Sequence, residues 1–97
     1  MRDVPELAPD AIRSAHGSIH PAFTYSPQFV HDGLSSRLGV PVIVKVETVN
    51  PIRSFKGRGA EAVLAALTPR PPAVIAASTG NFGQGIAWAA RRRGISA

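Results

Sequence analysis

A lysine set among glycines and arginines is the residue in this chain best suited to chemistry. It lies in the segment Ser54–Ala60, which reads SFKGRGA and joins a predicted strand to a predicted helix. An amine at the start of a helix can serve as a nucleophile, and Gly57 and Gly59 leave space for a bulky group beside the backbone. Taken alone, the pattern also fits a solvated lysine in a flexible turn, so Lys56 is a candidate residue.

A second polar turn, Ser78–Gly85 with the sequence STGNFGQG, also follows a predicted strand and opens a helix. Two hydroxyls, an amide side chain and the free N–H groups of a helix start come together there, which favours binding of a carboxylate or phosphate. The glycine spacing differs from that of dinucleotide-binding loops, and no P-loop sequence is present. The alternative is structural, with Ser78 as a helix cap and the glycines relieving close packing.

The spacing of apolar residues predicts the elements that position these two turns. Helices are expected over 9–16, over 29–38, from 54 to the prolines at 69–72, and over 82–93. Buried strands are expected over 40–46 and 73–77, and an extended loop over 18–27. A strand, a helix and a second strand predict a parallel pair with a right-handed crossover. Ligands bind at the carboxyl edge of such a sheet, where both polar turns would meet.

The composition indicates a globular chain or a piece of one. The 97 residues are 44% hydrophobic and 18% charged, which suits one small domain. The longest apolar runs fall far short of the roughly 20 residues that span a bilayer, so no membrane partner is expected. No cysteine is present, which excludes disulfides and thiol catalysis, and the three histidines lack metal-ligand spacing. No metal site is therefore predicted.

The net charge of +5 raises the question of a polyanionic partner. Three of the positive charges form the run Arg91–Arg93 at the end of a predicted helix, where cations offset the negative end of the helix dipole. A nucleic-acid partner is therefore not expected, although a basic RNA-binding module is the weakest of the alternatives. The chain opens Met-Arg-Asp-Val-Pro-Glu, with acidic residues where an export signal would be apolar, and a cytoplasmic protein is expected.

Together the two turns resemble those of the fold-type II pyridoxal-phosphate enzymes, the tryptophan synthase β-like superfamily, and most closely its threonine/serine dehydratase branch. The resemblance spans roughly residues 23–94 and rests on SFKGRGA followed by STGNFGQG. It implies an α/β fold, a partial three-layer αβα arrangement with parallel strands. Because two strands do not complete such a sheet, residues 1–97 are expected to be the N-terminal segment of a larger enzyme that lacks most of its C-terminal part. The parent enzyme would be a homo-oligomer.

The resemblance also implies roles for individual residues. Lys56 would form the Schiff base with pyridoxal 5′-phosphate and later move the proton at the substrate Cα. Phe55 would line the cofactor pocket, and Asn81 would hydrogen-bond the phenolic oxygen of the cofactor. The α-carboxylate of an amino-acid substrate would be held by Ser78, Thr79, Gly80 and Gln84.

The reaction implied is β-elimination and deamination of threonine or serine to a 2-oxo acid and ammonia, incomplete in this chain alone. Three departures leave other readings open. Phe82 stands where the dehydratase branch usually has histidine, and Ser78-Thr79 is closer to threonine synthase-like members. Arg53 replaces a small residue and could meet an acidic or phosphorylated substrate. The alternatives are a β- or γ-replacement enzyme, such as a threonine or cysteine synthase, and a non-catalytic fragment.

Overall fold

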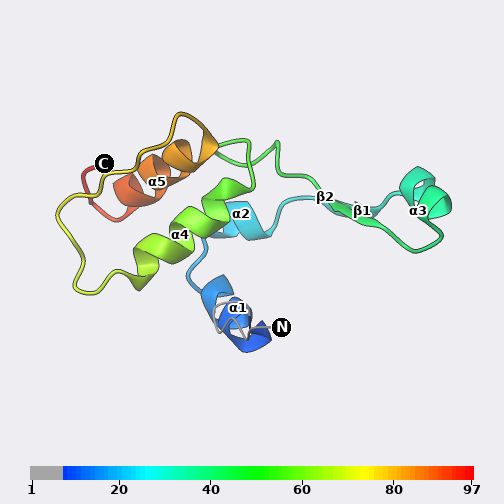
Figure 1. Ribbon diagram of the computed structural model, residues 1–97, viewed down its shortest axis with the longest axis horizontal. Helices are drawn as coiled ribbons and strands as arrows, with labels where there is room; N and C mark the ends of the chain where they lie inside the picture. Colours follow the sequence, from blue (N-terminus) through cyan, green and yellow to red (C-terminus); the bar gives the residue numbers. More distant parts are fainter. Residues whose placement is uncertain (1–7) are drawn as a thin grey trace.

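The computed structural model describes residues 8–97, which form five helices and two short strands (Figure 1). In chain order these are α1 (Pro9–His16), α2 (Pro21–Thr24), β1 (Gln28–Val30), α3 (Asp32–Leu38), β2 (Ile43–Lys45), α4 (Lys56–Ala66) and α5 (Asn81–Arg92). Residues 1–6, on which the expectation about an export signal was based, lie outside the described residues. No helix among residues 8–97 is long and apolar enough to cross a membrane.

The elements fall into a helical body and a projecting arm. Figure 1 shows α2, α4 and α5 together, with β1, β2 and α3 extending away from them to one side. The radius of gyration is 15.8 Å and the principal extents are 50 × 33 × 24 Å. A compact domain of this length would have a radius of gyration of about 12.5 Å. The arm therefore does not fold back onto the body.

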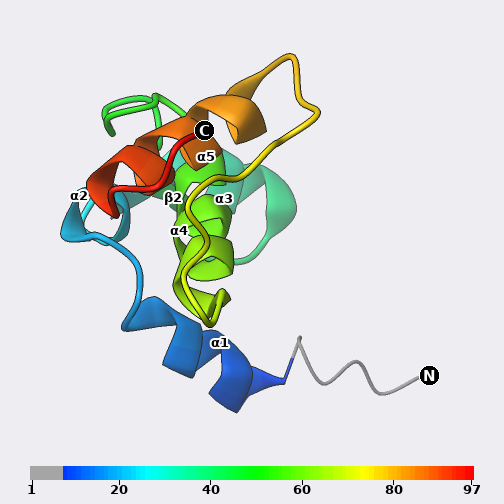
Figure 2. The same cartoon turned by 90° about the vertical axis from the view of Figure 1, so that its left-hand side faces the viewer.

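The core of the body is the contact between α4 and α5. Its buried residues are Ala60, Leu64, Ile86, Ala89, Ala90 and Ile95. Figure 2 shows α5 passing above α4 at an angle to it. The spacing of Ala60, Val63, Leu64 and Leu67 predicts one apolar face for α4. Ala60 and Leu64 are buried as predicted, but Val63 and Leu67 are exposed, and the charged residue Glu61 is buried instead.

Helix α2 forms where an extended loop was expected. Pro21 occupies its first turn, and the His20 ring accepts a hydrogen bond from the Ala22 N–H at 3.1 Å, which caps it. The single turn directs Phe23 into the body, where its side chain is fully buried. The Phe23 ring meets the Trp88 ring edge to face, with centroids 4.8 Å apart.

The sheet differs most from the expectation. Strand β2 lies within the predicted strand 40–46, but its partner is β1, and the two strands are antiparallel with Phe29 opposite Val44. Residues 29 and 30, expected to begin a helix, belong to β1, and α3 begins only after His31 caps it. Gly39 ends α3 with φ at +71°, as the sequence predicts.

The predicted second strand is reduced to an isolated bridge. Among the described residues, 73–77 does not pair with β2; Ala73 instead forms one parallel bridge with Ser96. Two hydrogen bonds support it, from the Val74 N–H to the Ser96 carbonyl at 2.8 Å and from the Ser96 N–H to the Pro72 carbonyl at 3.0 Å. The layered parallel sheet is therefore not formed here, because neither side of 73–77 has a full-length partner strand.

A buried carboxylate fastens α4 to α5. The Glu61 side chain has no exposed surface and accepts hydrogen bonds from the Arg92 and Arg93 guanidinium groups and from the His20 N–H. Burial favours the neutral acid and works to raise the pKa of Glu61, but the hydrogen bonds from both arginines, the charge of Arg93 and the His20 N–H outweigh it. The pKa of Glu61 therefore lies below its ordinary value.

A glycine pair in α4 allows a direct test of the contact with Phe23. A Cβ on Gly57 would lie 2.6 Å from Phe23 Cζ and 2.7 Å from Phe23 Cδ1, whereas a Cβ on Gly59 would meet no atom within 4 Å. We expect Gly57→Ala to lower the free energy of unfolding by about 1–3 kcal/mol through overpacking. Gly59→Ala, the matched control, should raise it by about 0.4–1 kcal/mol. Urea unfolding of both variants measures this, and equal effects would contradict the contact.

The Glu61 cluster predicts loss of stability in acid. Because the folded-state pKa is lowered, the stabilisation is complete above the ordinary carboxyl pKa and is lost as the pH falls through the folded-state value. Glu61→Gln should lower the free energy of unfolding at neutral pH by up to about 3 kcal/mol. The loss is limited because the Arg92 guanidinium, left without its carboxylate, is still in contact with water. The substitution should also flatten the decline in stability toward low pH.

Urea unfolding at a series of pH values checks both effects. Asp10→Asn is the control, because it removes a carboxylate whose ion pair with Arg13 is largely exposed. A wild-type decline in acid that persists in full in Glu61→Gln would show that other groups cause it.

Candidate functional site

Lys56 is the first residue of α4, where the sequence predicts it. Ser54 is buried beneath it, and the Ser54 hydroxyl accepts a hydrogen bond from the Lys56 N–H at 3.3 Å. The Lys56 side chain is exposed, and its Nζ lies 5.1 Å from the centroid of the Phe55 ring. The lysine amine is therefore exposed to solvent, and it lies beside the Phe55 ring at the positive end of a helix dipole.

The turn before Lys56 is held by one buried amide. Asn50 Oδ1 accepts hydrogen bonds from the N–H groups of Ile52 at 3.1 Å and Ser54 at 3.2 Å. Asn50 Nδ2 donates to the Ser54 carbonyl at 2.8 Å and to Glu47 at 3.0 Å. These bonds satisfy the turn's polar groups and keep Arg53 at a φ of +54°, a strained value for a residue with a side chain. The role of Asn50 was not predicted from the sequence. The signal that could have indicated it is the pair Asn50-Pro51, which is typical of a turn.

An ion pair ties α4 back to the strand side of the same turn. Arg58 Nη2 lies 2.9 Å from Glu47 Oε1, and the Glu47 side chain is 14% exposed. The same oxygen has no partner by hydrogen-bond geometry, so this contact is one of charge and not an aligned hydrogen bond. Arg58 is thus held by Glu47 while Lys56, two residues earlier, remains free of a carboxylate among the described residues.

The lysine side chain borders a cavity of about 390 Å³ lined by Phe55, Lys56, Arg58, Gly59 and Phe82. Phe82 follows Asn81, so this cavity joins the lysine turn to the start of α5. The Phe55 side chain is 58% exposed and that of Phe82 39%. Two aromatic rings with little cover beside a free amine are the surroundings expected of a planar ligand.

The second turn is built around Ser78. Its hydroxyl oxygen accepts hydrogen bonds from the Gly80 N–H at 3.3 Å and the Gly83 N–H at 3.1 Å. The N-cap residue of α5 is Gly80 and not Ser78, but the Ser78 hydroxyl still satisfies the Gly83 N–H in the first turn of the helix. Thr79, Gly80, Asn81 and Gln84 are all exposed, and none of them lines the lysine cavity.

The two turns lie at one end of the body because α4 and α5 run in the same direction. Gly85, early in α5, lies against the first turn of α4: a Cβ there would be 3.3 Å from the Lys56 carbonyl and 3.1 Å from Ala60 Cβ. Arg92, the last residue of α5, contacts Glu61, which lies farther along α4 than Lys56. Figure 1 shows both helices starting at the same end of the body. Lys56 and Asn81, the first residues of their helices, are thereby brought to one side.

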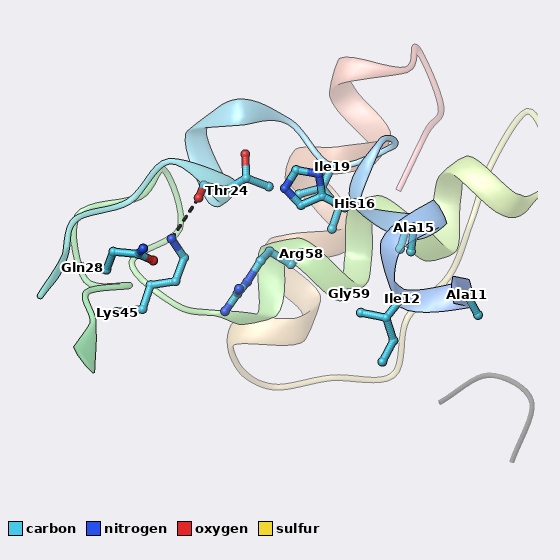
Figure 3. A pocket seen from close by; sticks show the side chains of 11 residues that line it. Ala11, Ile12, Ala15, His16, Ile19, Thr24, Gln28, Lys45, Arg58 and Gly59 are labelled. Carbon is cyan, nitrogen blue, oxygen red and sulfur yellow. Dashed lines mark hydrogen bonds between the residues drawn. The ribbon is translucent and has the colours of Figure 1, made fainter. Parts of the chain in front are cut away.

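A larger cavity of about 510 Å³ lies along α4 between α1 and the base of the arm (Figure 3). Arg58 and Gly59 belong to the linings of both cavities, and Lys56 borders only the smaller one. Lys45 enters the larger cavity but is tied down, since its Nζ donates to the Thr24 carbonyl at 2.9 Å and the Ser26 carbonyl at 3.2 Å. Groups of acidic residues and histidines that could hold a metal ion are absent from residues 8–97.

Known proteins resemble this chain over most of its length. A biosynthetic L-threonine dehydratase, IlvA, of Escherichia coli is 42% identical over 81 residues, which are 81% of this chain and 16% of that protein. The mitochondrial threonine dehydratase of Saccharomyces cerevisiae is 42% identical over 92 residues, 92% of this chain and 16% of that protein. The chain thus spans about a sixth of the length of these relatives.

A family profile described as "Pyridoxal-phosphate dependent enzyme" matches residues 19–97. The matched region contains the lysine turn, the turn at Ser78 and the whole contact between α4 and α5. The chain therefore belongs to the family of pyridoxal-phosphate dependent enzymes.

Proposed function

We propose that this chain supplies the lysine-bearing part of a pyridoxal-phosphate-dependent lyase that deaminates threonine or serine to a 2-oxo acid and ammonia. The observation that carries the proposal is the free amine of Lys56 on a cavity shared with the start of α5. The names of the relatives, threonine dehydratases, support the substrate class. Residues 1–97 would be the N-terminal segment of that enzyme, which would be a cytoplasmic homo-oligomer.

The residues present fit the cofactor. Lys56 offers a primary amine with no carboxylate partner among the described residues, and Phe55 offers an exposed aromatic face beside it. The Asn81 side chain is exposed at the head of α5 and can donate a hydrogen bond to the phenolic oxygen of the ring. When bound, pyridoxal phosphate supplies an electron sink for negative charge at the substrate Cα. The Lys56 amine can then take up and return the proton at that carbon.

The carboxylate of the amino acid would bind at the turn before α5. The hydroxyl of Thr79 and the amide of Gln84 are exposed there, together with the backbone of Gly80. The first N–H groups of α5 add a partial positive charge that favours an anion. Ser78 has its acceptor positions taken by Gly80 and Gly83 but keeps its hydroxyl proton to donate.

The covalent attachment of pyridoxal phosphate tests the assignment of Lys56. We expect the purified chain to develop a near-visible absorbance band on addition of the cofactor, and borohydride reduction to fix the cofactor on the Lys56 peptide, as found by mass spectrometry. Lys56→Arg should abolish both signals, because it keeps the charge without a condensable amine.

Lys45→Arg is the matched control, since that amine is bonded to two carbonyls and lies in the other cavity. Its absorbance should equal that of the unsubstituted chain. Attachment at Lys45 or at several lysines, with Lys56 unlabelled, would contradict the proposal.

The turn at Ser78 predicts different roles for its two hydroxyls. Ser78→Ala should lower the free energy of unfolding by about 0.5–2 kcal/mol, because the Gly80 and Gly83 N–H groups lose their acceptor. Thr79→Val should change stability by no more than about 0.5 kcal/mol. It should nevertheless weaken the effect of added threonine on the spectrum of the cofactor-loaded protein. A stability loss in Thr79→Val equal to that in Ser78→Ala would overturn this division.

A further inference from the structure

Glu61 is a buried ionised group that the proposed chemistry does not use. Its Oε2 accepts hydrogen bonds from Arg92 Nη2 and from the His20 N–H, both at 2.9 Å. Its Oε1 accepts from Arg93 Nη1, and Arg93 Nη2 also reaches the Glu61 carbonyl at 3.3 Å. One side chain of α4 therefore meets two consecutive residues at the end of α5. The Arg92 guanidinium also lies over the Trp88 ring, 5.9 Å from its centroid.

The apolar contact between the two helices combines a close backbone approach with a few large side chains. Near the lysine end it is made of Ala60, Gly85 and Ala89, whose small or absent side chains let the helices approach closely. Register along a helix pair is otherwise set by large side chains that fit between those of the partner. The buried side chains Leu64 and Ile86, and the close fit of Gly85 against Ala60, therefore set part of the register of α5 on α4.

The hydrogen bonds of the Glu61 carboxylate add a directional specification to this packing. Slipping α5 by one residue along α4 moves its backbone by about 1.5 Å, which lengthens or misaligns the 2.9 Å hydrogen bond from Arg92. Because the carboxylate is fully buried, water does not replace the lost partners. Buried polar groups are known to fix helix register in this way in coiled coils.

We propose that Glu61 is a positioning residue for the lysine site: it fixes α4 against α5 and so sets the separation of Lys56 from Asn81. The importance of this separation for cofactor binding rests on the proposed function, in which Lys56 and Asn81 bind the same cofactor. The register itself is a property of the chain alone. The two parts of the inference can therefore be tested separately.

A distance measurement tests the register without any ligand. The chain has no cysteine, and a Cβ added at Gly59 or at Gly80 meets no atom within 4 Å, so Gly59→Cys and Gly80→Cys can carry spin labels. Double electron–electron resonance on the full chain should give one narrow distribution of the distance between the two spin labels. In the Glu61→Gln background we expect the distribution to broaden or shift. A distribution that stays narrow at the same distance would overturn the proposal.

Two further backgrounds separate positioning from packing. Arg91→Gln removes a charge from the same helical turn without touching Glu61, and should leave the distribution unchanged. The double variant Glu61→Met, Arg93→Met replaces the charges by apolar side chains and should recover stability. A positioning role requires that this folded variant still show the broadened distribution. Recovery of the narrow one would mean that Glu61 only fills space, and this variant decides the matter if Glu61→Gln does not fold.

Binding of pyridoxal phosphate to the same variants then tests whether the register of α5 on α4 affects the lysine site. Attachment of the cofactor to Lys56 should weaken on the order of tenfold in Glu61→Gln and in the double variant, and remain unchanged in Arg91→Gln. Full attachment in a variant with a broadened distribution would overturn the link to the site. Failure of the unsubstituted chain to bind pyridoxal phosphate would instead overturn the proposed function, and the distance distributions would still decide whether Glu61 fixes the register.

Discussion

The parallel, close packing of α4 on α5 is the constraint on which the rest of the structure depends. It brings two helix starts to one end, and with them the Lys56 amine and the free N–H groups of α5. Parallel helices also bring like ends of their dipoles together, which is unfavourable unless charges offset it. The arginines at the end of α5 offset the negative end. At the positive ends, serine hydroxyls satisfy the N–H groups of Lys56 and Gly83 without adding a charge, and an anionic ligand bound there would complete the balance.

The helices could be predicted from sequence because their signals are local. Periodic apolar residues give α4 and α5 to within a few positions, and glycines at positive φ end α3 and follow α5. Helix α2 could not be predicted in this way. Its single turn is held by the His20 side chain and by the fit of Phe23 against Gly57 in α4, a contact between distant parts of the chain. Local patterns carry no information about such contacts.

The sheet shows the same limit more severely. A β-branched run predicts that 40–46 contains a strand, but not which strand it pairs with, because pairing depends on distant residues. The neighbour is β1, which has only three residues and too little length for an alternating pattern. The parallel bridge of Ala73 with Ser96, on either side of α5, is nevertheless the start of a strand–helix–strand unit of the expected kind. It begins one element later along the chain than expected.

Two buried polar groups that the sequence analysis missed act on either side of Lys56. The Asn50 amide fixes the turn before it, and the Glu61 carboxylate fixes the helix after it. The candidate ligand-binding residues could be named from sequence because their chemistry requires particular residue types at particular spacings. These two supporting groups carry ordinary side chains whose role depends on what they meet in the fold. Packing of Leu64, Ile86 and Gly85 sets the close approach of the two helices, and the directional bonds of Glu61 at the far end add to what positions the lysine end.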